Sequence, residues 1–252
     1  LASEGTYVLE AVATDAAGNT ATSTTLSMAI DLTDPTSAVS STGVSNNFIT
    51  NSTTLDLTFN FSETTTEFTV DDITRSGGSV SNFTSGVDGS TYTATFTSDG
   101  SQGSKSISIA DDVFTDAAGN NNTASNSFQW TIDTITPDAP TTIDLDASRD
   151  SSIDNDDITK QQPIITGRAE AGSSIDLYNG LTKIGTTTVN GTSAEIDNRT
   201  IKEWSWTAEG LLDGIYNITT TSTDAAGNTS TGSSALTVTI DSFIDTPTTS
   251  GL

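Results

Sequence analysis

The stretch Leu55-Asp56-Leu57-Thr58-Phe59-Asn60-Phe61 alternates apolar and polar residues over its whole length. Such alternation is typical of a strand with one face in a core and the other in water, because successive side chains point to opposite faces. Similar runs occur at residues 7–13, 92–96, 107–109, 204–206 and 236–240. No window has the period of an amphipathic helix, and none has the ~18 consecutive apolar residues of a membrane span. The sequence therefore predicts an all-β protein.

The composition narrows the possible chemistry. The 252 residues include no His and no Cys, and 33 Asp and Glu against 8 Lys and Arg give a formal net charge of −25. Without His and Cys the chain has no Ser–His or Cys–His pair, no ordinary zinc site and no disulfide. The negative charge repels nucleic-acid phosphates, so we expect no nucleic-acid partner. We expect a non-enzymatic protein that attracts cations.

Three copies of one hexapeptide divide the chain. Thr-Asp-Ala-Ala-Gly-Asn occurs at residues 14–19, 115–120 and 223–228, so its Asp recurs after 101 and then 108 residues. Each copy precedes an alternating run that ends in Ile-Asp, and a Pro follows a few residues later. A period near 100 residues is too long for a solenoid repeat and favours tandem sandwich domains.

Aromatic residues give further topological signals. Tyr7 and Tyr216 each follow a Gly shortly before a hexapeptide, which favours a tyrosine corner, in which the Tyr hydroxyl bonds back to the backbone. The middle repeat has Ser104 and Lys105 there instead. Trp204 and Trp206 share one strand face, which favours core packing over an exposed platform for stacking sugars.

Together the hexapeptide, the strand after it and the Ile-Asp-x-x-x-Pro ending resemble the bacterial Ig-like repeats of giant surface adhesins. These include RTX-type and biofilm-associated proteins exported by type I secretion. Residues 163–241 resemble one subtype and residues 53–133 a second, so the resemblance covers most of the chain. It implies an all-β fold of tandem immunoglobulin-like β-sandwich domains in an extended rod, whose junctions often bind calcium.

The repeats set the expected boundaries. We expect residues 1–33 to be the C-terminal strands of a truncated Ig-like domain, 34–137 a complete domain, and 138–245 a second domain of another subtype. Residues 246–252 would be a linker or the start of the next repeat. Because the sequence starts at Leu1 with neither Met nor a signal peptide, we also expect an internal fragment of a longer protein.

An Ig-like topology gathers acids from distant segments at one pole of each domain: two linker Asp, one Glu after the second strand and the Asp of the hexapeptide. The candidates are Asp31, Asp34, Glu63 and Asp116 in the middle domain and Asp133, Asp138, Glu170 and Asp224 in the last. Calcium takes about 6–8 oxygen ligands, so these poles are candidate Ca²⁺ sites. The alternative is that the hexapeptide is simply a turn, with an Asx-turn at Asp and left-handed Gly or Asn.

A second acidic group precedes the second strand of the last domain. Its candidate calcium ligands are Asp146, Asp150, Asp154 and Asp156, with Asp213 as a possible addition. The EF-hand pattern is not met, and a solvated acidic loop is the alternative. Asp241 repeats the Ile-Asp ending and is a further candidate metal ligand.

We therefore expect a structural extender of a large adhesin, secreted to the bacterial cell surface and associated with the outer membrane. Calcium would rigidify its junctions and so project a distal binding region. Its partners would be neighbouring Ig-like repeats, with any host-cell, glycan or surface ligand bound elsewhere in the full protein, and the segment itself would be monomeric. The alternatives are a glycan- or protein-binding Ig-like module and a spacer of a secreted polysaccharide-degrading enzyme.

Overall fold

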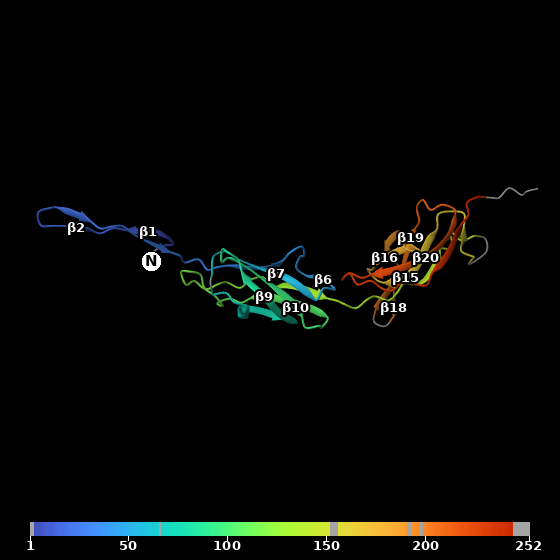
Figure 1. The fold of residues 1–252 in the computed structure, drawn as a ribbon, viewed down its shortest axis with the longest axis horizontal. Helices are drawn as coiled ribbons and strands as arrows, with labels where there is room; N and C mark the ends of the chain where they lie inside the picture. Colours follow the sequence, from blue (N-terminus) through green and yellow to red (C-terminus); the bar gives the residue numbers. More distant parts are fainter. Residues whose placement is uncertain (1–2, 66, 152–155, 191–192, 197–198, 244–252) are drawn as a thin grey trace, which may run out of the picture. The chain divides into compact units, whose positions relative to one another are not determined.

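The computed structural model describes residues 3–65, 67–151, 156–190, 193–196 and 199–243. Its regular structure is almost entirely β, and the described residues contain one short 3₁₀ helix, η1 (Val70–Asp72). The all-β prediction is thus confirmed. The chain divides into two compact units, which we describe separately (Figure 1). The first unit consists of residues 1–48 and 52–132, and the second of residues 49–51 and 133–252.

Residues 5–30 form two small antiparallel ladders. One pairs β1 (Gly5–Leu9) with β4 (Leu26–Ile30), and the other pairs β2 (Val12–Thr14) with β3 (Thr20–Thr22). Leu9 lies opposite Leu26, and both side chains are at least half exposed. This apolar surface is therefore not part of a core within the described residues.

The first sandwich packs two four-stranded sheets face to face. The order of one sheet is β5-β7-β10-β9 and that of the other is β6-β12-β11-β8. Their bounds are β5 Ser37–Ser41, β6 Phe48–Thr50, β7 Thr54–Phe61, β8 Ile73–Ser76, β9 Gly78–Ser85, β10 Thr91–Ser98, β11 Gly103–Ile109 and β12 Phe128–Ile132. The alternation at residues 55–61 is that of β7, whose Leu57, Phe59 and Phe61 enter the core.

A second sandwich has the same plan with one more strand. The sheet β13-β15-β19-β18 faces the sheet β14-β21-β20-β16-β17. The bounds are β13 Thr141–Leu145, β14 Ile158–Thr159, β15 Ile164–Glu170, β16 Ser174–Asn179, β17 Thr182–Thr188, β18 Ser193–Ile196, β19 Arg199–Thr207, β20 Gly214–Thr223 and β21 Leu236–Ile240. β14 runs parallel to β21, whereas the other recorded pairings of this sandwich are antiparallel.

Both tryptophans of β19 belong to this second core. Trp204 is only 3% exposed, and Trp206 is partly buried and packs against the same cluster. The prediction of core packing is confirmed. An exposed aromatic platform for sugar rings is therefore not built from these two residues.

The strand that precedes each hexapeptide starts in the same register. Gly5, Gly103 and Gly214 pair with the Ile that ends the last strand of their respective hairpins. Two residues later, the Tyr216 hydroxyl donates to the Leu212 carbonyl at 2.8 Å, as expected of a tyrosine corner. Tyr7 makes the same bond to the carbonyl four residues upstream, at 2.6 Å.

At the equivalent position of the first sandwich stands Lys105. Its side chain is 1% exposed, and its Nζ donates to Ser101 Oγ at 2.7 Å, again four residues upstream. Nζ also forms an ion pair with Asp99 at 3.3 Å. A buried ammonium thus ties this loop to its strand where the other two hairpins use a phenol.

Candidate metal centre

The hexapeptide loops are held by their own Asp. In the loop between β11 and β12, Asp116 Oδ1 accepts the backbone N–H groups of Ala118, Gly119 and Asn120 at 2.7–2.9 Å, and Oδ2 accepts Asn120 Nδ2 at 2.8 Å. These bonds, led by that of the Asn120 side chain, lower the pKa of Asp116. Gly119 has φ +91°, the left-handed conformation that glycine tolerates. The hexapeptide thus forms the expected turn, with an Asx-turn at Asp116 and a left-handed Gly119.

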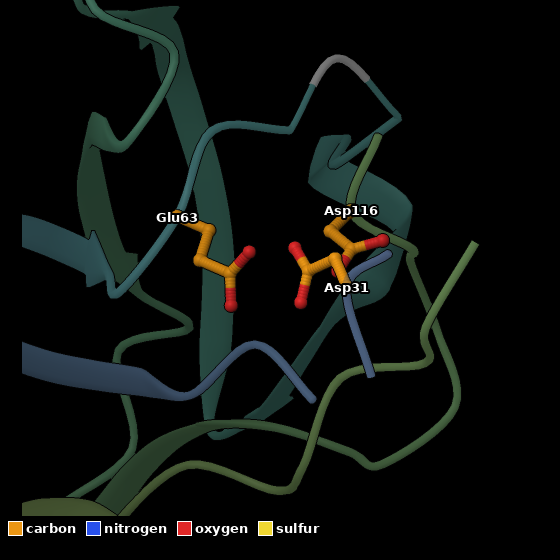
Figure 2. Close-up of side chains that lie close together, drawn as sticks. All are labelled: Asp31, Glu63 and Asp116. Atoms are coloured by element: carbon orange, nitrogen blue, oxygen red, sulfur yellow. The ribbon is translucent and has the colours of Figure 1, made fainter. Parts of the chain in front are cut away.

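Three of the predicted ligands come together in the first unit. Asp31, Glu63 and Asp116 each place one carboxylate oxygen within 4.8 Å of the others, and Figure 2 shows the three side chains facing one another. Asp31 lies just after β4, Glu63 just after β7, and Asp116 in the β11–β12 loop. The linker and two loops thus meet at one pole, whereas Asp34 is exposed and lies outside this group.

Two residues that the sequence analysis missed bring these loops together. Glu67 Oε2 accepts the backbone N–H and the hydroxyl of Thr115, at 3.2 and 2.7 Å. Thr65 Oγ1 donates to the Thr115 carbonyl at 2.9 Å. The loop that carries Glu63 is thereby held against the loop that carries Asp116. In the sequence, the only available signal was that Thr65 and Glu67 are polar and follow Glu63 by two and four residues. That both bind Thr115 becomes visible only in the fold.

The electrostatics of the group favour a cation. Burial raises the pKa of Glu63, and the charges of Asp31, Asp116 and Glu4 raise it further. Ionised Glu63 therefore opposes folding, and this cost grows as the pH rises from the ordinary glutamate pKa of 4.5 through the raised folded-state pKa. None of the ion pairs found in the described residues involves these three acids. The donor set is hard carboxylate oxygen, which suits Ca²⁺ better than softer metals.

The equivalent pole of the second unit is arranged differently. Asp224 caps its loop as Asp116 does, and Asn228 Nδ2 donates to the Asp133 carbonyl at 2.9 Å. Asp138 and Glu170 line a cavity of about 130 Å³ together with Arg168. Among the described residues, no three acids of this unit bring carboxylate oxygens within 4.8 Å of one another.

The acidic stretch before β15 is held largely by local bonds. Asp146 Oδ1 accepts the N–H and hydroxyl of Ser148, and Asp156 accepts the Ser151 hydroxyl at 2.9 Å. Asp154 lies outside the described residues. Asp150 lines a cavity of about 370 Å³ that Lys160 and Asp241 also line.

Asp157 is an acid in this stretch that the sequence analysis did not single out. Burial raises its pKa, and the charges of Asp144, Asp150 and Asp156 add to the effect. One of its carboxylate oxygens is buried without a hydrogen-bond partner. The negative charges of these acids act on one another, which makes the stretch a second candidate for cation binding, although no three of its described carboxylate oxygens lie as close together as those of Asp31, Glu63 and Asp116.

Strand order defines the class of protein. Lettered along the chain, the sheets of the first sandwich are A-B-E-D and A′-G-F-C, and the second sandwich adds C′ beside C. This is the arrangement of an immunoglobulin-like sandwich. Sequence profiles described as bacterial Ig-like domain match residues 31–132 and, with a second profile, residues 136–242. The chain belongs to the bacterial Ig-like domain families, with two such domains in tandem.

Solved structures to which the chain is similar include two from Yersinia pseudotuberculosis. The chain is 16% identical to adhesin InvE with a TM-score of 0.25, and 19% identical to InvD with a TM-score of 0.30. The alignments with InvE and InvD include 82% and 86% of this chain. They include only 58% and 62% of the InvE and InvD chains, respectively. The chain thus spans about three fifths of these two structures.

A third similar structure is a complex of Dpr2 Ig1–Ig2 with DIP-Theta Ig1–Ig3, at 10% identity and a TM-score of 0.21, covering 81% of this chain and 98% of that one. No curated protein matches the sequence. No helix in the described part of the chain is long and apolar enough to cross a membrane.

Proposed function

We propose that this chain is an extender segment of a large bacterial cell-surface adhesin, and that calcium stiffens the junctions between its Ig-like domains. The observation that carries the proposal is the group of Asp31, Glu63 and Asp116, which joins a linker to two loops of the domain that follows it. Membership of the bacterial Ig-like families supports a structural, non-enzymatic role. The sequence resemblance supports secretion to the cell surface by a type I, RTX-like route.

The mechanism follows from charge. Without a cation, three close carboxylates repel one another, and this repulsion destabilises the packing of the linker that carries Asp31 against the two loops. A bound Ca²⁺ neutralises them and ties the three segments together, so binding free energy becomes folding free energy. At a calcium concentration of about 100 times Kd, one such site adds about 2.7 kcal/mol to the stability of the folded state.

Further calcium ions would bind at the weaker candidates. These are Asp146, Asp150 and Asp156 between β13 and β14, Asp241 just after β21, and Asp133, Asp138, Glu170 and Asp224 at the linker pole of the second sandwich. A rod held in this way projects a distal region that grips a host-cell, glycan or surface ligand. The segment itself would contact only neighbouring repeats and stay monomeric.

The test is calorimetric titration of the full chain with CaCl₂ after removal of divalent ions. We expect Glu63→Gln to weaken the tightest site at least ~10-fold, because it removes one of three charged ligands. Thermal unfolding should show the matching loss, with calcium no longer raising the melting temperature of the first unit. Asp34→Asn is the matched control, since Asp34 lies in the same linker but outside the group. Absence of calcium binding, or equal weakening by both substitutions, would overturn the proposal.

A further inference from the structure

The side chain of the hexapeptide Asn has two amide hydrogens. In all three copies of the hexapeptide, one of them is donated to the same kind of acceptor. Asn19, Asn120 and Asn228 each donate from Nδ2 to the Oδ2 of their own Asp, at 2.8 Å in every copy. The copy at residues 14–19 forms this loop on an isolated hairpin. The bond therefore belongs to the turn and needs nothing outside it.

The second amide hydrogen distinguishes the copies. Asn120 Nδ2 also donates to the Asp31 carbonyl at 3.2 Å, and Asn228 Nδ2 to the Asp133 carbonyl at 2.9 Å. Both acceptors are the Asp of an Ile-Asp ending, the residue at which the linker begins. For Asn19, whose loop has no such linker among the described residues, only the bond to its own Asp is recorded.

From this pattern we infer that the hexapeptide Asn is a positioning residue that clamps the backbone of the linker at the start of each complete domain, without any metal. A carboxamide suits this role because its two N–H groups are fixed in one plane and can serve two acceptors at once. Asn228 is 7% exposed, so water competes poorly for its amide.

The linker Asp is fixed from its own side as well. Asp31 Oδ1 accepts the N–H of Thr33 at 3.1 Å, and Asp133 Oδ1 accepts the N–H of Ile135 at 2.9 Å. These Asx-turns set the direction in which the chain leaves the residue. With the carbonyl held by the Asn amide and the carboxylate held by the turn, the start of the linker has little freedom left.

The clamp acts independently of the proposed calcium site. In the second unit Asn228 and Asp133 are bonded although no three acids there form a close group within the described residues. The linker that starts at Asp133 should therefore stay ordered in chelator. Its order would survive even if calcium binding at Glu63 proved wrong, so the two proposals fail separately.

One measurement uses the unmodified full chain in excess chelator. Hydrogen exchange of side-chain amides by NMR should show that the faster Nδ2 hydrogen of Asn120 and of Asn228 exchanges at least ~10-fold more slowly than the faster Nδ2 hydrogen of Asn19. Asn19 is the internal control, because it shares the loop and lacks the linker bond. Equal rates at all three residues would overturn the inference.

A second measurement uses Asn228→Ala, with Asn19→Ala as the matched control for loss of the bond within the loop. We expect the backbone order parameter of Ile135 to fall from about 0.85 to below about 0.6 in Asn228→Ala, and to keep its original value in Asn19→Ala. Amide protection of β20 and β21 should be retained, which checks that the domain still folds. An ordered Ile135 in a folded Asn228→Ala, or a disordered Ile135 in the unmodified chain with chelator, would contradict the clamp.

Discussion

Lys105 shows how a single residue can replace a structural motif. Tyr216 anchors its loop through a neutral hydroxyl, whereas Lys105 brings an ammonium into the core and must keep an acid beside it. An unpaired buried charge is far more costly than an unpaired hydroxyl. The stability of the first sandwich therefore depends on the ionisation of Asp99, and that of the second has no equivalent dependence on its corner.

Substitution of Asp99 tests this difference. Hydrogen bonds from the Ser101 hydroxyl and backbone, followed by that of Lys105, lower the pKa of Asp99 from 3.8 to about 2. A lowered folded-state pKa adds stability above the unfolded value, and this stability is lost as the pH falls through about 2. We expect Asp99→Asn to lower the melting temperature of the first unit at pH 7 and to match the unmodified chain near pH 2.

Thermal unfolding between pH 7 and pH 2 measures the effect. Asp71→Asn is the control, because Asp71 is an exposed acid for which no hydrogen bond is recorded. A deficit in Asp99→Asn that persists unchanged at pH 2 would show that shape, and not charge, is what Asp99 contributes.

The sequence predicted which loop acids of the first sandwich would come together, but it did not predict which linker acid would join them. Glu63 and Asp116 follow from strand order, because the loops after β7 and β11, strands B and F of the sandwich, meet at one end. That Asp31 joins them while Asp34 does not depends on the Asx-turn at Asp31, which redirects the chain. Such a turn competes with several other conformations of the same residues, so the sequence alone could not select between the two acids.

At the scale of the strand, packing depends on which residues lie opposite each other on neighbouring strands. The alternation of apolar and polar residues does not specify these pairs. Gly167 of β15 lies opposite Trp204 of β19. A Cβ at Gly167 would lie 2.4 Å from Trp204 Cζ2, so the indole occupies the space that a side chain would take. Alternation predicted that both residues belong to strands of a sandwich. The need for Gly at this point appears only once the register of β15 and β19 is known.

Gly167→Ala should therefore destabilise the second unit by about 1–3 kcal/mol through overpacking. Urea unfolding followed by tryptophan fluorescence measures the change. Gly232→Ala is the control: its added Cβ would meet no heavy atom within 4 Å, and its expected effect is within about 0.5 kcal/mol. Equal stability of the two variants would mean that the indole shifts freely, contrary to its tight burial.

The hairpin of β1 and β4 shows what a strand pair lacks when it is not part of a sandwich. Leu9 and Met28 are 50% and 43% exposed, whereas Ile218 and Val238, in the same register of β20 and β21, are both 0% exposed. The hydrogen-bonded ladder is similar, but the burial that stabilises it is absent among the described residues. Two strands alone are marginal in water.

At the scale of the whole molecule, the formal net charge of −25 is the sum over the entire chain. Only three ion pairs occur among the described residues, so few of the acids there are paired with a cationic side chain. Their mutual repulsion acts over a Debye length of about 10 Å at 0.1 M salt and is weakened by added salt.

Raising NaCl from about 0.01 M to 0.5 M in chelator should therefore increase the melting temperatures of both units. Differential scanning calorimetry with the two transitions assigned by Glu63→Gln and Gly167→Ala measures this. Calcium at millimolar concentration, added at constant ionic strength, should raise the transition of the first unit beyond the effect of salt. A melting temperature that falls with salt would mean that attraction between charges, and not repulsion, governs the chain.

The parallel pairing of β14 with β21 has a mechanical consequence. If the second domain is pulled by its two ends, tension that reaches β14 draws it toward its own start, while β21 is drawn toward its own end. Because these strands run in the same direction, they are pulled past each other along their axes. The hydrogen bonds that Thr239 N–H donates to the Asp157 carbonyl and Asp241 N–H to the Thr159 carbonyl are then loaded together. A hairpin pulled open from its free ends loses its bonds one at a time. The shortest strand of the domain is thus the one whose bonds would have to break simultaneously under shear.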